Sequence, residues 1–511
     1  MDFLTFFVVI FCIFWSCFHV LKSSLRSQRY TKLPPGPYPY PIIGNIFQLG
    51  RNPHQSLTKL SKTYGPLMYL KLGSINTMVV SSPEIAKEVL QKHDQAFSSR
   101  IITAAARALD HHKASVACLP AESKWRSYRK ICKEQMFSLE RLEASQGLRR
   151  DKLQKLLDYV QECRSSGQVV DIAEVAFVTS LNLISNTLFS VDFAHFNSDA
   201  SQELKEIVGN VMKILGTPNL GDFLPVLKWI DPQGAKRNAE IYFGKLLAIF
   251  DDIINGRLLS RGTQIGSPLK HDVLEALLDL SQRNDSGLSI NDIKHLLLDL
   301  FVAGTDTTAS TVHWAMTELL RNPEKLLKAK HELSSIVGEN EQVEESDISK
   351  LPYLQAVIKE TFRYHPPGPF LSHKAEHVVE INGYMIPKNS QILVNLWATG
   401  RDSNVWINPD SFEPERFLDS SIDVRSGQNF ELIPFGAGRR ICPGLPLAYR
   451  MVHLMVASLI YSFDWKLEPG MEPKDIDLNE KFGLSLQKAV PLKAIPIKTV
   501  TVPFTIYGKS I

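Results

Sequence analysis

The chain has 511 residues, with 57 Lys and Arg against 54 Asp and Glu, and its formal net charge is +3. So balanced a composition gives no bulk-charge argument for a nucleic-acid partner. Hydrophobic residues make up 44% of the chain, enough for a large core, and its six cysteines are too few for a disulfide scaffold. We therefore expect a globular protein of a reducing compartment that binds no nucleic acid.

The N-terminus begins with a run of about 19 mostly apolar residues, Phe3 to Leu21, without Lys, Arg, Asp or Glu. Such a run is long enough to cross a bilayer, and the basic residues that follow it, starting at Lys22, place the rest of the chain in the cytosol. A cleaved signal peptide is the alternative, but Asp2 stands where a positive charge is usual. The pattern predicts residues 1–21 as a single-pass membrane anchor.

Prolines crowd the segment after the anchor, in Leu33-Pro34-Pro35-Gly36-Pro37 and again at Pro39 and Pro41. Because such a run is stiff and cannot continue a helix, we interpret residues 22–41 as a basic, proline-rich hinge. A disordered linker is the alternative.

The remaining residues, 42–511, show no internal repeat and no boundary, and we interpret them as one catalytic domain. The expected elements follow in this order: a hairpin from Leu67 to Val80, a chiefly helical stretch from Ser82 to about Ala356 with a polar break at 262–268, and strands from Val378 to Asn395 around an Asn382-Gly383 turn. The pattern predicts a mainly α fold with small β-sheets at both ends.

A long helix is expected from about Ile290 to Arg321, and it contains Ala303-Gly304-Thr305-Asp306-Thr307-Thr308. Glycine and β-branched residues are poor choices inside a helix, and locally weakened helices are often functional. The Thr307 hydroxyl can bond back to the Ala303 carbonyl and open a notch. Asp299 shares this helix face at i, i+4, i+8 spacing, so it borders a pocket or is a structurally paired acid. An ordinary Thr-rich helix is the alternative.

Two further pairs have helical spacing. Glu360 and Arg363 are an i, i+3 pair, and Arg416 follows downstream in Phe412-Glu413-Pro414-Glu415-Arg416-Phe417. Trp125 and Arg129, in Trp125-Arg126-Ser127-Tyr128-Arg129, lie four residues apart on one face. Each pair alone is commonplace on a helix surface.

The clearest chemical signal is Phe435-Gly436-Ala437-Gly438-Arg439-Arg440-Ile441-Cys442-Pro443-Gly444, which presents one cysteine on a glycine-rich loop. The apolar stretch from Leu445 to Phe463 predicts a helix directly after it. We place Pro443 at the first helical position and Cys442 at the cap. There the free N–H groups of Gly444 and the next residue can stabilise a thiolate.

The other residues of this loop suit a site for a large flat group. Gly436 and Gly438 let the backbone pass close to such a group, Phe435 can shield the sulfur, and Arg440 offers a fork for a carboxylate. A buried cysteine in a capping turn is the alternative, which this set of residues at this spacing disfavours.

The ten residues from Phe435 to Gly444 carry the haem-binding signature of the cytochrome P-450 family, which this chain resembles over nearly its whole length. The resemblance implies the cytochrome P-450 fold and haem b as cofactor, with Cys442 as the axial ligand of the iron. It implies that Asp306 and Thr307 support proton delivery, and that Glu360, Arg363 and Arg416 form a structural triad behind the haem. Residues implied to bind the cofactor are Trp125, Arg129, His373, Phe435, Arg440, Cys442 and Gly444. His373 departs from the family pattern, because many relatives carry Pro-Arg where this chain has Ser372-His373.

The resemblance also implies partners and a place in the cell. We expect an endoplasmic-reticulum protein with a cytosolic catalytic domain. NADPH and flavins act indirectly through a cytochrome P-450 reductase, with cytochrome b5 as a further candidate donor. Basic residues near the cysteine side predict the docking face, with a solvated basic surface as the alternative: Lys124, Arg126, Lys130, Lys133, Arg439 and Arg450.

The substrate segments of the family align with mostly apolar residues here, which suits a hydrophobic ligand. The candidate pocket residues are Ile101, Ile102, Asp299, Ala303, Phe370, Leu371, Phe482 and Leu484. The clan of plant terpenoid hydroxylases that contains geraniol 8-hydroxylase and ferruginol synthase is similar to this chain in Leu351 to Val357, Phe430 to Pro434 and Glu480 to Lys488. We therefore expect a monooxygenase that hydroxylates a terpenoid. The alternatives are a phenolic substrate of tyrosine or coumarin type, a reductase-independent haem-thiolate isomerase or dehydratase, and a non-catalytic haem carrier.

Overall fold

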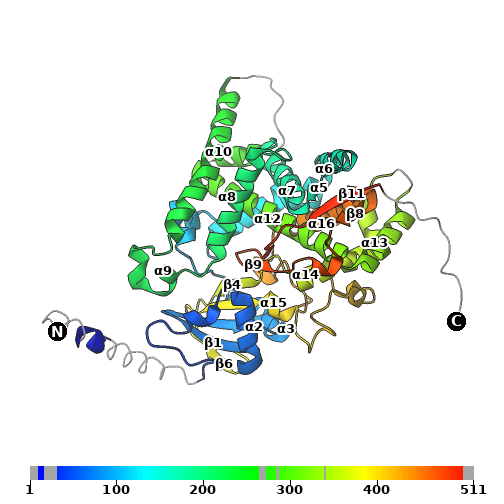
Figure 1. Ribbon diagram of the computed structural model, residues 1–511. Helices are drawn as coiled ribbons and strands as arrows, with labels where there is room; N and C mark the ends of the chain where they lie inside the picture. Colours follow the sequence, from blue (N-terminus) through cyan, green and yellow to red (C-terminus); the bar gives the residue numbers. More distant parts are fainter. Residues whose placement is uncertain (1–9, 16–31, 264–271, 284–286, 339–340, 499–511) are drawn as a thin grey trace, which may run out of the picture.

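The computed structural model describes residues 10–15, 32–263, 272–283, 287–338 and 341–498, and Figure 1 shows how their elements are arranged. As expected, the protein is mainly helical with small sheets. The α-helices are α2 (Pro53–Tyr64), α3 (Pro83–Lys87), α4 (Ser123–Cys132), α5 (Leu139–Ala144), α6 (Gln146–Ser166), α7 (Ile172–Phe189), α8 (Asp199–Gly216), α9 (Leu220–Phe223), α10 (Ala235–Thr263), α11 (Val273–Ser281), α12 (Ile290–Arg321), α13 (Pro323–Ile336), α14 (Pro352–Tyr364), α15 (Leu396–Thr399) and α16 (Leu445–Ser462).

Short 3-10 and π turns connect many of these helices. They are η1 (Ile46–Leu49), η2 (Glu88–Lys92), η3 (Ala105–Lys113), η4 (Lys133–Phe137), η5 (Pro225–Trp229), η6 (Glu345–Lys350), η7 (Pro414–Phe417), η8 (Gly438–Arg440) and η9 (Pro473–Asp475). The strands are β1 (Leu67–Leu72), β2 (Ile75–Val80), β3 (Val170–Asp171), β4 (Phe370–Lys374), β5 (Val379–Ile381), β6 (Tyr384–Ile386), β7 (Gln391–Asn395), β8 (Asp464–Leu467), β9 (Glu480–Lys481), β10 (Gln487–Lys488) and β11 (Lys493–Ile497).

The sheet at the bottom of Figure 1 joins two parts of the chain that the sequence pattern left apart. The hairpin β1–β2 is confirmed, with Leu67 opposite Val80. Strand β7 then runs parallel to β2, and β4 pairs with β7, so the order is β1-β2-β7-β4. The expectation of separate sheets at the two ends of the chain is therefore wrong, because a long crossover brings β7 beside β2. The turn between β5 and β6 is confirmed, with Asn382 and Gly383 both at positive φ.

Helix α12 passes through the middle of the helical part (Figure 1) and has the bounds that the sequence predicts. A capping box of Ser289 and Asp292 begins it. A Cβ at Gly304 would lie 2.8 Å from Cδ1 of Ile184 on α7, so this glycine allows α7 and α12 to pack closely. Helices α7 and α16 are long and apolar enough to span a membrane, but both are mostly buried inside the protein, which makes them core helices.

The proline-rich segment lies along the sheet. The N–H of Tyr69 on β1 donates to the Pro35 carbonyl at 2.8 Å, and Asn45 Nδ2 donates to the Pro37 carbonyl at 3.3 Å. Of the expected anchor, residues 10–15 are helical and exposed, and the rest lies outside the described residues, as do residues 22–31 of the hinge and 264–268 of the polar break.

Candidate active site

Cys442 lies on the loop between η8 and α16, where its N–H donates to the Phe435 carbonyl at 2.9 Å. The sulfur accepts hydrogen bonds from the N–H groups of Gly444 and Leu445, the two donors that the sequence predicts. The helix itself begins later than expected: Gly444 is the cap, and the proline of the first turn is Pro446. Placing Pro443 at the first helical position is therefore wrong, because Pro443 and Gly444 form a turn before the helix.

The surroundings of the sulfur are sheltered and contain few charges. Burial raises the pKa of the Cys442 thiol, while the Gly444 N–H, the Arg129 charge and the Leu445 N–H act in the opposite direction. A metal ion held by Cys442 would supply the missing charge, because a ligating thiol is deprotonated. A Cβ at Gly444 would lie 3.9 Å from the sulfur and 3.8 Å from Phe137, so Gly444 packs against both. The donor set fits a metal-thiolate bond.

The two glycines of the loop serve different purposes. Both have positive φ, 72° at Gly436 and 66° at Gly438. A Cβ at Gly438 would lie 2.1 Å from the carbonyl oxygen of Leu90 on η2, whereas at Gly436 it would only touch Leu371 at 3.7 Å. Gly438 is thus required by the backbone of η2, which differs from the expected approach to a flat group.

Three arginines gather beside this loop, and we call Arg100, Arg129 and Arg440 the arginine cluster. Arg440 Nε donates to the Ser98 carbonyl and Arg129 Nη2 to the Ile441 carbonyl, each at 2.7 Å. Within the part of the chain that the structure describes, none of the three pairs with a carboxylate. Burial, followed by the charges of Arg100 and Arg129, lowers the pKa of Arg440 to about 9. This uncompensated positive charge fits the carboxylates of an anionic cofactor such as the haem propionates.

Trp125 lies between two members of this cluster. Its ring centre is 4.5 Å from the guanidinium of Arg440 and 5.6 Å from that of Arg129. Its indole N–H donates to the Val116 carbonyl at 3.1 Å. The indole N–H is thus satisfied within the chain, and the Trp125 ring stacks against the two guanidinium groups.

His373 on β4 is buried next to the cluster. Its Nδ1 lies 2.7 Å from the Phe97 carbonyl, which accepts from an N–H, so this nitrogen carries the proton. Burial and the charge of Arg100 hold the pKa of His373 well below its usual value, so the ring is neutral and Nε2 is an acceptor. His373 is therefore a neutral ring whose proton goes to the Phe97 carbonyl, and its role in binding the cofactor stays a prediction.

On α12, Thr307 Oγ1 donates to the Ala303 carbonyl at 2.7 Å, which confirms the predicted bond. The helix stays uninterrupted there, so no wider notch accompanies it. Ala303 is exposed although most of α12 is buried, which leaves room on this face. Asp306 is buried and accepts hydrogen bonds from Ser485 Oγ and from Gln487 Nε2 of β10. Sequence reasoning missed both partners, and no local pattern signals them.

Asp299 is a structurally paired acid in this structure, and its place beside the pocket stays a prediction. It accepts from His111 Nε2 at 3.1 Å, from Ser115 Oγ at 3.0 Å and from the Ala117 N–H at 3.4 Å. His111 Nδ1 lies 3.0 Å from Nδ1 of His295. This network ties η3 and the segment after it to α12.

The other candidate pocket residues come from three segments. Ile101 and Ile102 are half-buried in the loop after Arg100, and Phe370 and Leu371 are half-buried on β4. Phe482 and Leu484 lie in the turn between β9 and β10, where Phe482 is half-buried and Leu484 is exposed. The structure brings Phe370 and Phe482 together, with ring centres 6.2 Å apart. No described contact ties Ile101 and Ile102 to the pair.

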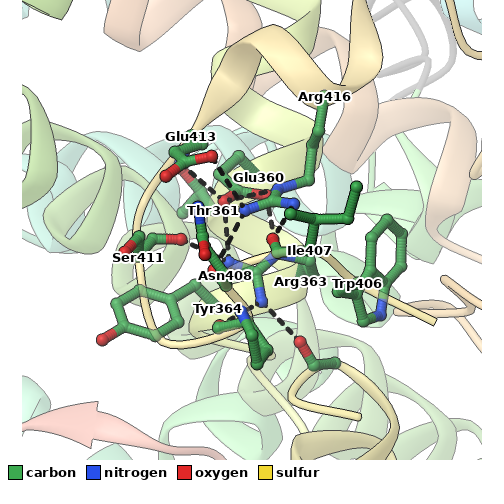
Figure 2. Close-up of polar contacts among 12 residues, drawn as sticks. Glu360, Thr361, Arg363, Tyr364, Trp406, Ile407, Asn408, Ser411, Glu413 and Arg416 are labelled. Atoms are coloured by element: carbon green, nitrogen blue, oxygen red, sulfur yellow. Dashed lines mark hydrogen bonds and ion pairs between the residues drawn. The ribbon is translucent and has the colours of Figure 1, made fainter. Parts of the chain in front are cut away.

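Figure 2 shows the triad of Glu360, Arg363 and Arg416. Arg363 binds Glu360 through two nitrogens at 2.7 Å each, and Arg416 Nε reaches the same carboxylate at 3.1 Å. Arg363 also donates to the carbonyls of Pro409 and Ser411. The structure thus brings the three residues together and ties α14 to the segment before η7.

The expected basic docking face is partly neutralised. Lys124 pairs with Asp292 at 2.8 Å, Arg439 with Asp94 at 3.0 Å and Arg450 with Glu345 at 3.2 Å. Lys130 lies 3.8 Å from Glu134. The exposed basic side chains of Arg126 and Lys133 remain as the main carriers of positive charge there.

The Cys442 sulfur accepts from two N–H groups, and the arginine cluster beside it pairs with no carboxylate among the described residues. This arrangement suits a haem-thiolate protein, whose haem brings both an iron and carboxylates. A family model described as Cytochrome P450 matches residues 34–493. The chain therefore belongs to the cytochrome P450 family and is a haem-dependent monooxygenase.

Individual relatives are similar over almost the whole chain. Cytochrome P450 76T24 of Catharanthus roseus is 59% identical over 485 residues, which cover 95% of this chain and 97% of that protein. Ferruginol synthase of Salvia miltiorrhiza is 53% identical over 474 residues, 93% of this chain and 96% of that protein. Sugiol synthase of the same plant is 50% identical over 475 residues, again 93% and 96%.

Proposed function

We propose that this protein hydroxylates a small hydrophobic plant terpenoid, a mono- or diterpenoid, with O2 and electrons from NADPH. The observation that carries the proposal is the 53% identity to ferruginol synthase over 93% of the chain. The aromatic pair Phe370 and Phe482 supports it, because apolar rings suit a hydrocarbon skeleton.

In this proposal Cys442 ligates the iron of haem b, and the N–H groups of Gly444 and Leu445 hold its sulfur in place. The bound haem supplies the activation of O2. Arg129 and Arg440 hold the propionates, and Trp125 keeps both guanidinium groups in position. Phe435 lies edge-on to Phe362 at 5.3 Å, and its carbonyl accepts from the Cys442 N–H, so both ends of the residue are held.

Thr307 and Asp306 handle protons in this proposal. The Thr307 hydroxyl can exchange the Ala303 carbonyl for a partner on the exposed side of α12. Burial raises the pKa of Asp306, while Ser485, Gln487 and the charge of Lys481 act against this. A carboxyl group with a raised pKa holds and releases a proton nearer neutral pH, as a proton donor needs.

We further infer a single-pass anchor in the endoplasmic reticulum, a cytosolic catalytic domain, and electron supply by NADPH–cytochrome P450 reductase with cytochrome b5 as a second donor. The apolar run from Phe3 to Leu21 and the basic residues after it support this topology. Protease treatment of intact microsomes should digest the catalytic domain. Its protection would contradict the cytosolic placement.

The test of the proposed substrate is incubation of microsomes that carry this protein and a plant reductase. Mono-, sesqui- and diterpenoids are offered beside tyrosine and coumarins, and mass spectrometry detects the addition of one oxygen. NADPH-dependent oxygenation of a terpenoid is the expected result, and oxidation confined to the phenolic compounds would refute it. Thr307→Ala should consume NADPH without product, and Cys442→Ser should lose the red-shifted Soret band of the reduced carbonyl complex.

A further inference from the structure

Glu480, the first residue of β9, gathers side chains from distant parts of the chain. Its Oε2 accepts from His54 Nε2 at 2.8 Å and from Gln55 Nε2 at 3.2 Å, and its Oε1 accepts from Trp397 Nε1 at 3.1 Å. Burial favours the neutral acid, but the hydrogen bond from His54 and the charges of His54 and Arg401 lower the pKa of Glu480 to about 2. Glu480 is therefore a buried anion that holds its donors firmly.

His54 has a second contact that the other donors lack. Its ring stacks on Phe482, with centres 5.5 Å apart and planes 7° apart, while Trp397 meets it edge-on at 5.3 Å. The His54 side chain is fully buried, and Asn395 Nδ2 donates to its backbone carbonyl at 3.1 Å. The ring of His54 is thus fixed through its backbone, through Glu480 and through Trp397.

Phe482 is less constrained than its neighbour. It is half-buried, and its other described aromatic contact is the edge-on one with Phe370 at 6.2 Å. The backbone just after it is held, because the Leu484 N–H donates to the Met212 carbonyl at 2.9 Å. With the backbone held, the orientation of the Phe482 ring is what can still vary. The stacked contact with His54 favours one orientation of that ring.

We propose that His54, on α2, is a positioning residue that fixes the Phe482 ring and thereby shapes one wall of the substrate pocket. A histidine suits this place because one edge donates to Glu480 while the face stacks on Phe482. The proposal rests on the proposed function only in taking Phe482 as a pocket residue.

Two variants of His54 separate its two contacts, and a third variant is the control. His54→Gln keeps a donor for Glu480 but loses the stacked ring, and His54→Phe keeps the ring but loses the donor. Gln55→Ala removes another donor to Glu480 without touching Phe482. Each holoenzyme is first checked for the red-shifted Soret band of its reduced carbonyl complex, which shows that the thiolate ligand is intact. The Soret shift then measures dissociation constants for 1-phenylimidazole and for the bulkier clotrimazole.

His54→Gln should change the ratio of the two dissociation constants about three- to tenfold, the range that one aromatic contact provides. Gln55→Ala should keep the ratio, and so should His54→Phe, because the backbone and Trp397 still hold the ring at this position without Glu480. An equal change in Gln55→Ala would show that the effect comes from Glu480, and an unchanged ratio in His54→Gln would show no positioning; either overturns the proposal. If His54→Gln does not fold, a changed ratio in His54→Phe overturns it.

A double-mutant cycle tests whether His54 acts through Phe482. In a Phe482→Leu background, His54→Gln should leave the ratio unchanged, whereas a further shift would contradict the proposal. Because azole binding needs no terpenoid, the two proposals can fail separately. Failure to oxidise any terpenoid would refute only the proposed substrate, and an unchanged ratio of the two azole dissociation constants in His54→Gln would refute only the role of His54.

Discussion

Two groups of buried arginines in this protein differ in whether a carboxylate neutralises their charge. Arg363 and Arg416 share the carboxylate of Glu360, and backbone carbonyls take their remaining N–H groups (Figure 2). In the arginine cluster, Arg129 and Arg440 reach only carbonyls and the ring of Trp125. The first group is complete within the chain, whereas no carboxylate among the described residues pairs with the second, which fits an anionic cofactor.

This difference separates a structural from a binding role for the same residue type. A buried charge is tolerated when it is paired and costly when it is not. Burial lowers the pKa of Arg100 and Arg440, to about 10 and about 9, which reflects that cost. Binding of an anionic cofactor beside these arginines would remove the cost of burying their charge. The lack of a carboxylate partner among the described residues therefore indicates an anionic ligand.

The largest effect is expected from breaking the complete group. Glu360→Ala leaves Arg363 and Arg416 buried without their shared anion, so the free energy of unfolding should fall by about 3–5 kcal/mol, with loss of bound haem. Urea unfolding followed by circular dichroism measures it. Glu413→Ala is the control, because this exposed carboxylate lies 3.6 Å from Arg416 and should matter by less than about 1 kcal/mol. Equal losses would contradict the structural role of the triad.

The arginine cluster should respond in the opposite way. Arg440→Leu removes a donor to the anion, and haem transfer to apomyoglobin should become about 10- to 100-fold faster, as expected for one charge-assisted hydrogen bond. The melting temperature of the apoprotein should stay or rise, since repulsion from Arg100 and Arg129 is relieved. Arg439→Leu, next in sequence but paired with Asp94, should change neither. A destabilised apoprotein with unchanged haem transfer would place Arg440 in the structural group.

His373 should make the protein sensitive to acid. Its folded-state pKa lies well below 6.5 because of burial, so the unfolded chain takes up a proton below about pH 6.5 that the folded protein excludes. Stability from this site is therefore present at neutral pH and is lost as pH falls below about 6.5, by up to about 1.4 kcal/mol per pH unit. His373→Gln should flatten the decline of melting temperature between about pH 6.5 and 4.5. The exposed His195→Gln should not, and identical slopes for both would refute the prediction.

The smallest effect is expected at the surface pair of Arg439 and Asp94, both partly exposed. A double-mutant cycle should give a coupling of about 0.2–1 kcal/mol that fades in roughly 1 M salt. A salt-independent coupling above that range would mean that this pair belongs with the buried arginines.

Contacts between residues close in sequence were predictable. The bond from Thr307 to Ala303 and the pair of Glu360 and Arg363 follow from helical spacing, which fixes which side chains meet. The N–H donors to the Cys442 sulfur are also close in sequence and were predictable. The cap of α16 was not, because a turn before the helix makes Gly444 rather than Cys442 the capping residue. Partners from elsewhere in the chain were not predictable from spacing, as for His373, whose N–H donates to the Phe97 carbonyl.

By itself the sequence indicated the family through its resemblance, and it predicted the bounds of α12, the bond from Thr307 to Ala303 and the two N–H donors to Cys442, because each of these contacts has a local physical cause. Only the tertiary structure decided which distant groups hold them.

The tertiary contacts join Asp306 to Ser485, Asp299 to His111, and His54 to Glu480 across 426 positions. Such contacts depend on which helices and strands pack together, and that packing is set by the burial of the whole core rather than by spacing along the chain.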